Sequence, residues 1–134
     1  MNDCIFCKII KGEVPCVKVF EDGDLLAFLD IAPINKGHTL VIPKQHYETI
    51  DQVPKELLHK IMDKVQDIAK ALLKMSDGVN VQENNKKIAG QLVPHVHFHV
   101  IPRHKGDGFK FTWEHKKYEE GEMEEYMERI VELL

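Results

Sequence analysis

The most constraining stretch of the chain is residues 94–103, PHVHFHVIPR, in which histidines alternate strictly with apolar residues. In an extended strand successive side chains point to opposite faces, so residues two positions apart share a face and lie about 6.6 to 6.8 Å apart. The alternation therefore predicts a strand with His95, His97 and His99 on one face and apolar side chains on the other. Three imidazoles on one face suit metal binding, a basic cradle for phosphate, or nucleophilic catalysis supported by neighbouring imidazoles. The alternative is a strand whose outer face is merely polar.

Turn residues and hydrophobic periodicity divide the rest of the chain into short strands and helices. From about residue 54 to residue 73 apolar side chains recur every three or four positions, which predicts one long amphipathic helix. The expected elements in chain order are a short helix within 4–12, a hairpin at 17–30, a strand at 39–43, the long helix, a strand at 79–82, the histidine strand at 92–102 and an acidic amphipathic helix within 119–134. This order predicts an α+β fold, with a five-stranded antiparallel sheet, one long helix and short terminal helices.

The composition fits a single domain over residues 1–134, because a chain of this length with 43% hydrophobic residues can bury a modest core. A net charge of −4 gives no general electrostatic footprint for nucleic acid, so we expect no nucleic-acid partner. No apolar run approaches the roughly 20 residues that span a bilayer, and the first residues lack the features of a signal peptide. We therefore expect no membrane partner and a cytoplasmic location. The three cysteines, an odd number, do not suit the disulfide framework of a secreted domain.

The stretch HVHFHVI resembles the histidine triad motif, which gives its name to a family of nucleotide hydrolases and transferases. The segments CIFCKIIKGEVPCVKVFED, LAFLDIAPINKGHTLVIPKQH and AGQLVPHVHFHVIPR resemble the family in order and spacing. The resemblance covers residues 4–104, so it implies a histidine triad fold for this core. Residues 105–134 would then form a C-terminal extension that carries the acidic helix.

The resemblance implies that His97, the middle histidine, is the nucleophile. A neutral imidazole would attack the α-phosphorus of a purine nucleotide and form a nucleotidyl-histidine intermediate, which water resolves to release a nucleoside monophosphate. Imidazole suits this task because its reference pKa near 6.5 leaves it largely unprotonated at neutral pH. His99, on the same face, would hydrogen-bond phosphate oxygens. His38, in GHTLVIP, matches a further phosphate-side or orienting residue of the family.

Before the histidines, three further residues match family positions that meet the phosphates, namely Asn84, Gly90 and Gln91. Glycine allows the backbone to approach phosphate closely, and an amide can donate a hydrogen bond without adding charge. The next residue, Leu92, departs from the nucleotide-binding branch, where a serine often donates a hydrogen bond near the scissile bond. Leucine cannot donate this hydrogen bond, so the departure affects the contact to the leaving group.

The resemblance also implies a nucleoside pocket. Asp30 matches an acidic residue that accepts hydrogen bonds from the ribose hydroxyls. The apolar positions around the base correspond to Phe6, Ile9, Val14, Phe28 and Leu29, for which plain core packing is the alternative. An apolar slot stacks on a base without reading its edge, so a preference for purines is expected rather than strict adenine specificity.

Cys4 and Cys7 form a Cys-x-x-Cys pair, which in a cytosolic protein indicates metal or redox chemistry. The resemblance implies a structural zinc site, because many microbial members carry this pair with histidines that match His46 and His95. Four such ligands close a tetrahedron and leave no open position for a substrate water. A thioredoxin-like redox pair is the alternative, although the βαβ pattern that usually surrounds it is absent. Cys16 has no partner in this scheme and is expected to be a small, partly buried residue.

Two branches of the family remain open from the sequence. One cleaves nucleoside phosphoramidates and aminoacyl-adenylates, and the other cleaves dinucleoside polyphosphates, the branch that the tail PRHKGDGF resembles. A non-catalytic, zinc-stapled protein that binds nucleotides or partners is a further alternative. Family members are commonly homodimers, so the resemblance implies a second copy of the chain as a partner.

Overall fold

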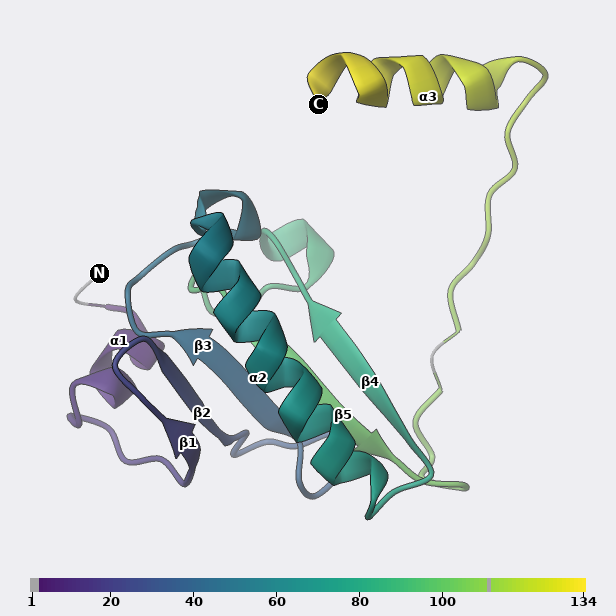
Figure 1. Cartoon of the computed structure of the whole chain (residues 1–134). Helices are drawn as coiled ribbons and strands as arrows, with labels where there is room; N and C mark the ends of the chain where they lie inside the picture. Colours follow the sequence, from purple (N-terminus) through teal and green to yellow (C-terminus); the bar gives the residue numbers. More distant parts are fainter. Residues whose placement is uncertain (1–2, 111) are drawn as a thin grey trace.

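The computed structural model describes residues 3–110 and 112–134 (Figure 1). In chain order the elements are α1 (Ile5–Ile10), β1 (Lys18–Glu21), β2 (Leu25–Leu29), β3 (Thr39–Pro43), α2 (Lys55–Leu73), β4 (Gly78–Glu83), β5 (Phe98–Arg103) and α3 (Glu122–Leu133), with 3₁₀ turns at Ile50–Gln52 and Lys87–Ala89. The strands form one sheet in the order β1-β2-β3-β5-β4, and every neighbouring pair is antiparallel. The predicted α+β fold with a five-stranded antiparallel sheet is confirmed.

The first two strands form the predicted hairpin. Asp22 closes its turn, because its Oδ1 accepts hydrogen bonds from the backbone N–H groups of Asp24 and Leu25, each at 2.8 Å. All five residues of β2 then pair with β3. β2 is apolar throughout and β3 is apolar after Thr39, and both are almost wholly buried, as expected for strands that are covered on both faces.

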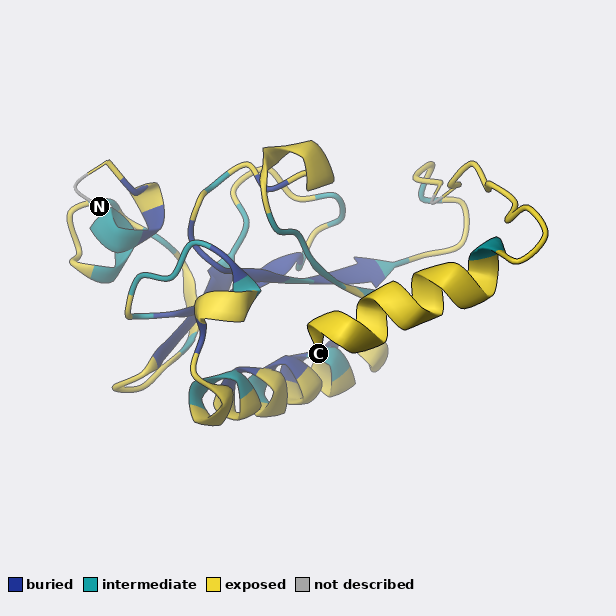
Figure 2. Cartoon of the chain, turned by 90° about the horizontal axis from the view of Figure 1, so that it is seen from above, coloured by how far each residue is buried: buried dark blue, intermediate teal, exposed yellow. Residues whose placement is uncertain are grey.

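The long helix α2 covers one face of the sheet, and α1 lies on the other side (Figure 2). The helix buries one stripe of side chains spaced three or four residues apart, namely Ile61, Val65, Ile68 and Leu72. These pack with the apolar residues that alternate with the histidines, Val96, Phe98 and Val100. A second cluster fills the α1 face and consists of Cys4, Phe6, Leu26, Phe28, Leu40 and Ile42. The histidine face is therefore the α1 face.

The histidine strand is shorter than expected. It begins at Phe98 rather than near residue 92, so His95 and His97 precede the ladder. Pro94 has no N–H to donate to a ladder, and the N–H of Val96 donates to the carbonyl of Tyr47 outside the sheet at 2.8 Å. The alternation of faces persists because this segment is still extended.

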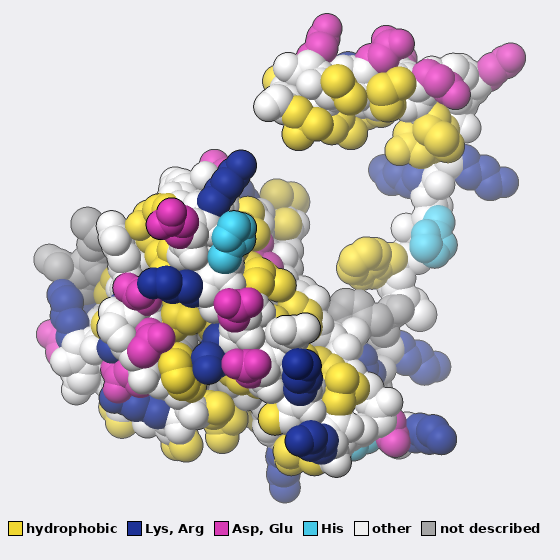
Figure 3. Space-filling view, viewed as in Figure 1, with side chains coloured by type: hydrophobic (Ala, Val, Ile, Leu, Met, Phe, Trp, Pro, Cys, Tyr) yellow, Lys and Arg dark blue, Asp and Glu magenta, His cyan; other side chains and the backbone are white. Residues whose placement is uncertain are grey.

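Residues 112–134, which we call the C-terminal arm, lead away from the sheet (Figure 1). An extended stretch ends at Gly121, whose positive φ of 78° turns the chain into α3. No residue of α3 is buried, and its apolar side chains gather along one side of the helix (Figure 3). Among residues 3–110 and 112–134, no helix has the length and hydrophobicity needed to cross a bilayer. The assignment of the whole chain to a single domain stays a prediction.

Candidate active site and metal centre

A cavity of about 410 Å³ opens on the α1 face of the sheet. Eight of the ten residues predicted for catalysis or substrate binding line it: Phe6, Ile9, Phe28, Asp30, Asn84, Gly90, His97 and His99. Val14 and Leu29 line it as well. The two predicted residues outside the lining are His38, which lies behind His99, and Gln91.

One end of the cavity is apolar and aromatic. The helix α1 places Phe6 edge-on against Phe28, with ring centroids 5.5 Å apart, and against His97 at 5.0 Å. Edge-to-face is one of the two arrangements that aromatic rings prefer. The cavity therefore joins a slot for a flat apolar group directly to the histidines.

The hydrogen bonds of His97 fix which of its nitrogens carries the proton. Nδ1 lies 2.7 Å from the backbone carbonyl oxygen of His95, and a carbonyl can only accept. Nδ1 must therefore be protonated, and Nε2 of the neutral ring keeps its lone pair. This tautomer leaves a nucleophilic nitrogen on a residue that lines the cavity.

A chain of hydrogen bonds fixes His38 and His99 in the same way. The N–H of Ile34 donates to His38 Nδ1 at 3.1 Å, so the proton of the neutral ring is on Nε2. That Nε2–H donates to His99 Nδ1 at 2.9 Å. His99 therefore carries its own proton on Nε2, which can donate to an anionic group in the cavity. His38 thus lies behind His99 and is hydrogen-bonded to it, while its predicted phosphate-side or orienting role stays a prediction.

Asp30, His38 and His99 also bring three metal-ligating atoms within 4.8 Å of one another. A metal would need the lone pair of His38 Nε2, but the hydrogen bond from Ile34 occupies the lone pair of Nδ1 and puts the proton on Nε2. This group therefore suits a hydrogen-bonded chain better than a metal.

Burial sets the protonation state of these imidazoles. It lowers the pKa of His97 and of His38 below the ordinary value. Burial, with His97 and His38 as neighbours, lowers the pKa of His99 to about 4. All three rings are neutral at pH 7, the state that a nitrogen nucleophile requires.

Asp30 follows β2 at the rim of the cavity. Its Oδ1 accepts a hydrogen bond from the backbone N–H of Ala32 at 2.9 Å, which orients the carboxylate. Its Oδ2 lies 3.8 Å from His38 Nε2. The carboxylate remains partly exposed, so it can accept further hydrogen bonds from a ligand.

The loop between β4 and β5 brings Asn84 and Gly90 together. Gly90 has a φ of 95°, which favours glycine, and its carbonyl lies 3.4 Å from Asn84 Nδ2. Gln91 is buried and points away from the cavity. Its amide accepts from the N–H of Lys86 at 2.8 Å and donates to the carbonyl of Glu48 at 2.6 Å. Gln91 thus shapes this loop, while its predicted donation to phosphate stays a prediction.

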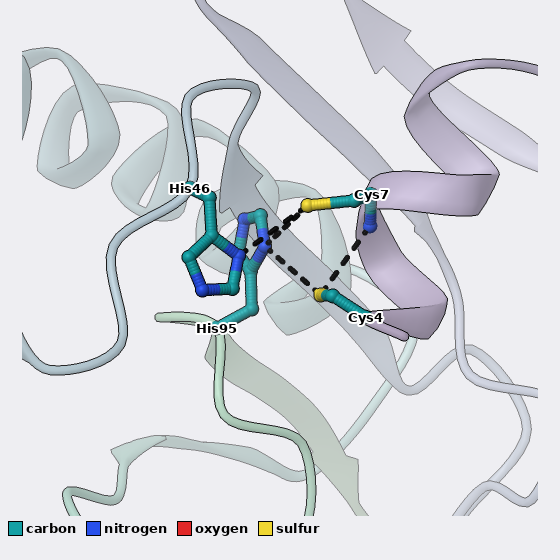
Figure 4. Close-up of side chains that lie close together, drawn as sticks. All are labelled: Cys4, Cys7, His46 and His95. Atoms are coloured by element: carbon teal, nitrogen blue, oxygen red, sulfur yellow. Dashed lines mark hydrogen bonds between the residues drawn. The ribbon is translucent and has the colours of Figure 1, made fainter. Parts of the chain in front are cut away.

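The four predicted metal ligands converge at the start of α1 (Figure 4). His95 Nδ1 lies 3.4 Å from Cys4 Sγ and 3.7 Å from Cys7 Sγ, and His46 Nδ1 lies 3.3 Å from Cys7 Sγ. In a tetrahedral zinc site, bonds of about 2.3 Å to sulfur and about 2.05 Å to nitrogen place S and N roughly 3.6 Å apart. The observed distances fit the edges of such a tetrahedron.

A further hydrogen bond prepares His95 as a ligand. Its Nε2 donates to the carbonyl of Pro43 at 2.8 Å, so the lone pair is on Nδ1, the nitrogen that faces the sulfurs. The donor set and its tautomer therefore fit zinc. His95 is fully buried and separates the metal cluster from His97.

Several residues that line the cavity were not predicted, among them Ile34, Leu40, Gln82 and Val93. Leu40 and Gln82 face the cavity because β3 and β4 flank β5, a strand order that local sequence signals do not specify. Leu92, the departure noted in the sequence, also lines the cavity and is 88% exposed.

The HIT domain, the domain of the histidine triad family, matches residues 11–106. The chain belongs to the histidine triad family. An uncharacterized HIT-like protein of Methanocaldococcus jannaschii is 55% identical over 106 residues, which are 78% of this chain and 82% of that protein. Adenosine 5'-monophosphoramidase hnt1 of Schizosaccharomyces pombe is 50% identical over 100 residues, or 75% and 74% of the two chains. Adenylylsulfatase HINT3 of Arabidopsis thaliana is 45% identical over 79% of this chain, which spans only 55% of that protein.

Solved structures extend the similarity to the C-terminal arm. A HIT family member from Bacillus subtilis superimposes with a TM-score of 0.91 at 43% identity, covering 98% of this chain and 97% of that one. A Zn-bound histidine triad family protein from Mycobacterium smegmatis gives a TM-score of 0.77 at 34% identity, with 99% of each chain covered. The predicted family is confirmed.

Proposed function

We propose that this protein is a nucleotide hydrolase that cleaves at the α-phosphate of adenosine or related purine nucleotides and releases the nucleoside monophosphate. The observation that carries the proposal is the tautomer of His97, a residue that lines the cavity: its Nδ1–H is bonded to a carbonyl, which leaves the lone pair on Nε2. Similarity to an adenosine 5'-monophosphoramidase and an adenylylsulfatase supports the substrate class.

In the first step, His97 Nε2 forms a bond to the α-phosphorus while the bond from phosphorus to the leaving group breaks. The ring becomes positively charged, and the hydrogen bond from Nδ1 to the His95 carbonyl stabilises that charge. In the second step, a water oxygen bonds to phosphorus and gives up a proton to solvent, while the P–N bond breaks with its electron pair returning to Nε2, which restores the neutral ring. The His38–His99 chain supplies a donor to the phosphoryl oxygens in both steps.

The two ends of the cavity would hold the rest of the substrate. Phe6, Ile9 and Phe28 would contact the base, and the Asp30 carboxylate would accept from the ribose hydroxyls. Asn84 and Gly90 lie on the other side, where the phosphates would run. Phosphoramidates and dinucleoside polyphosphates share this nucleoside end, so both substrate classes are tested below.

We also propose a structural zinc ion bound by Cys4, Cys7, His46 and His95. The closed donor set would tie α1, and with it Phe6, to the segment that precedes β5. Zinc binding would contribute free energy to folding. With four protein ligands the ion would have no open coordination position for chemistry.

We further propose that the protein is a homodimer in which the C-terminal arm contacts the second copy. The arm exposes a stripe of apolar side chains on α3, including Tyr126, Met127 and Ile130. The Bacillus subtilis structure superimposes over nearly the whole chain, so a similar arm exists in a solved relative. A helix of 12 residues with one apolar side is marginal in water without a partner to cover it.

The test of the activity is release of AMP from adenosine 5'-phosphoramidate and, in parallel, from diadenosine tetraphosphate. His97→Ala should abolish turnover of both, whereas His59→Ala, on the exposed side of α2, should leave it unchanged. Acid-quenched wild-type protein should show a mass increase of one AMP moiety that is lost in His97→Ala. The ratio of the two rates identifies the branch.

If wild-type, zinc-loaded protein binds AMP but turns over neither substrate, the protein is a nucleotide-binding module and the proposed hydrolase is wrong. If His97→Ala keeps its activity, a different nucleophile is responsible.

A further inference from the structure

The turn that follows β5 contains a carboxylate with an unusually complete set of donors. The Asp107 side chain is only 8% exposed. It accepts from Arg103 Nε at 2.8 Å and Nη2 at 3.0 Å, from the N–H groups of His104 and Phe109 at 3.1 Å each, and from Asn35 Nδ2 at 2.9 Å. The Arg103 guanidinium is the main reason that the pKa of this carboxyl is well below its usual range. Two of these donors belong to Arg103 at the end of β5 and two to the turn itself, but Asn35 comes from a loop 72 residues earlier in the chain.

Asn35 connects that turn to the loop that carries His38. Its Nδ2 also donates to the carbonyl of Pro102 on β5, at 2.8 Å. Its own backbone carbonyl accepts the N–H of His38 at 3.0 Å. The side chain of Asn35 is thus hydrogen-bonded to the end of β5, while its backbone carbonyl is hydrogen-bonded to His38.

The conformation of this loop decides what the His38 ring can do. Ile34, the residue before Asn35, donates the hydrogen bond that places the His38 proton on Nε2. That proton is the one shared with His99. A loop that is released at Asn35 can lose the Ile34 bond, and His38 can then adopt either tautomer.

We propose that Asp107 is a positioning residue for this active site: through Asn35 it holds the His38 loop so that His38 donates to His99. The role in catalysis rests on the proposed function, whereas the role in fixing the His38 tautomer does not. Neither Asp107 nor Asn35 lines the cavity, so both act on the site from behind it.

The same turn offers a matched control. Asp77 accepts the N–H of Lys105 at 2.9 Å, and its own N–H donates to the carbonyl of Arg103 at 2.9 Å. Asp77 therefore also holds the turn after β5, but its hydrogen bonds go to Lys105 and Arg103 rather than to the His38 loop. Asp77→Asn perturbs the anchoring of the turn alone.

The experiment compares Asp107→Asn, Asn35→Ala, the double variant and Asp77→Asn. Nitrogen NMR of the imidazoles reports the tautomers of His38 and His99, and steady-state kinetics with adenosine 5'-phosphoramidate reports kcat and KM separately. We expect both single variants to show mixed His38 tautomers and a kcat lowered about 10- to 100-fold, with KM nearly unchanged. The double variant should lose no more than either single variant, because both substitutions break the same connection. Asp77→Asn should resemble the wild type in both measurements.

Folded Asp107→Asn and Asn35→Ala proteins with the wild-type tautomer of His38 would overturn the proposal, as would additive losses of kcat in the double variant. If Asp107→Asn does not fold, Asn35→Ala alone decides, since it leaves the carboxylate and Arg103 in place. If wild-type protein has no turnover, the NMR measurement still tests the positioning role, so its failure is distinguishable from failure of the hydrolase proposal.

Discussion

At His97 the chemistry depends on which ring nitrogen holds the proton. One carbonyl, that of His95, makes this choice, and one N–H, that of Ile34, makes the corresponding choice for His38. Each is a backbone group, so its position depends on the conformation of the segment that carries it, which for Ile34 is the loop held at Asn35. The site is therefore set by main-chain geometry as much as by the identity of its histidines.

The lowered pKa of His99 predicts a loss of stability in acid. Its folded-state pKa of about 4 lies below the unfolded value near 6.5, so the unfolded chain binds more protons between these pH values. Stability should fall as the pH falls through this window, by about 2 kcal/mol from this residue at pH 5. Urea unfolding at pH 7 and pH 5 measures the effect. His99→Asn should show a smaller difference between the two pH values, whereas His59→Asn, on an exposed position, should keep the wild-type difference.

Leu92 predicts a gain of activity by substitution. The residue is 88% exposed at the cavity, so Leu92→Ser removes little packing. A hydroxyl there could donate to the leaving group, and we expect kcat with adenosine 5'-phosphoramidate to rise about tenfold. Leu92→Ala separates the hydroxyl from the loss of bulk, and an equal rise in Leu92→Ala would show that the donor is irrelevant.

Residue types at the site could be predicted from sequence, but their mutual contacts could not. The motif placed His97, His99 and Asp30 at the cavity, while the orienting role of His38 became specific only with its two hydrogen bonds. Gln91 carries no local signal that its amide would be used within the protein, because its partner Glu48 is 43 residues away.

At the level of elements, the sequence indicated each helix and strand because hydrophobic period and turn residues are local signals. The hairpin and β3 lie where the sequence predicted them, within 17–30 and at 39–43. The histidine strand was predicted too long, since the bond from Val96 to Tyr47 that ends the ladder joins segments far apart in sequence. Local periodicity gives no information about hydrogen bonds between segments that are far apart in the sequence.

The proposed zinc site predicts that α1 depends on zinc for its attachment. The helix has only six residues, which is too short to be stable by itself. Cys7→Ser should lower the zinc content and reduce the melting temperature by about 10 °C, with AMP affinity reduced because Phe6 loses its support. Zinc analysis and calorimetry measure the change, and Cys16→Ser, which keeps all four ligands, is the control. Zinc-free wild-type protein with an unchanged melting temperature would contradict the proposed structural role of zinc.

At the scale of the whole molecule, the C-terminal arm differs from the core because it exposes both its acidic and its apolar side chains. Most of the acidic residues of the arm lie on α3, opposite an apolar stripe, and no residue of this helix is buried. Such a helix gains stability when its apolar side is covered and its acidic side remains in water. A second copy of the chain would cover it symmetrically, with each arm on the other core.

This arrangement predicts that the apolar side of α3 controls the oligomeric state. Met127→Glu with Ile130→Glu should convert the proposed dimer to a monomer, because charges on the stripe oppose its burial. Glu128→Gln with Glu132→Gln changes the opposite side of the same helix and should leave the dimer intact. Sedimentation velocity across a concentration series distinguishes the two states. If the Met127→Glu, Ile130→Glu variant is still a dimer, the contact lies elsewhere on the chain. If the wild-type protein is a monomer, the proposed homodimer is wrong. Because no residue of α3 lines the cavity, the monomeric variant should retain AMP binding, so a loss of binding would show that the arm also completes the nucleotide site.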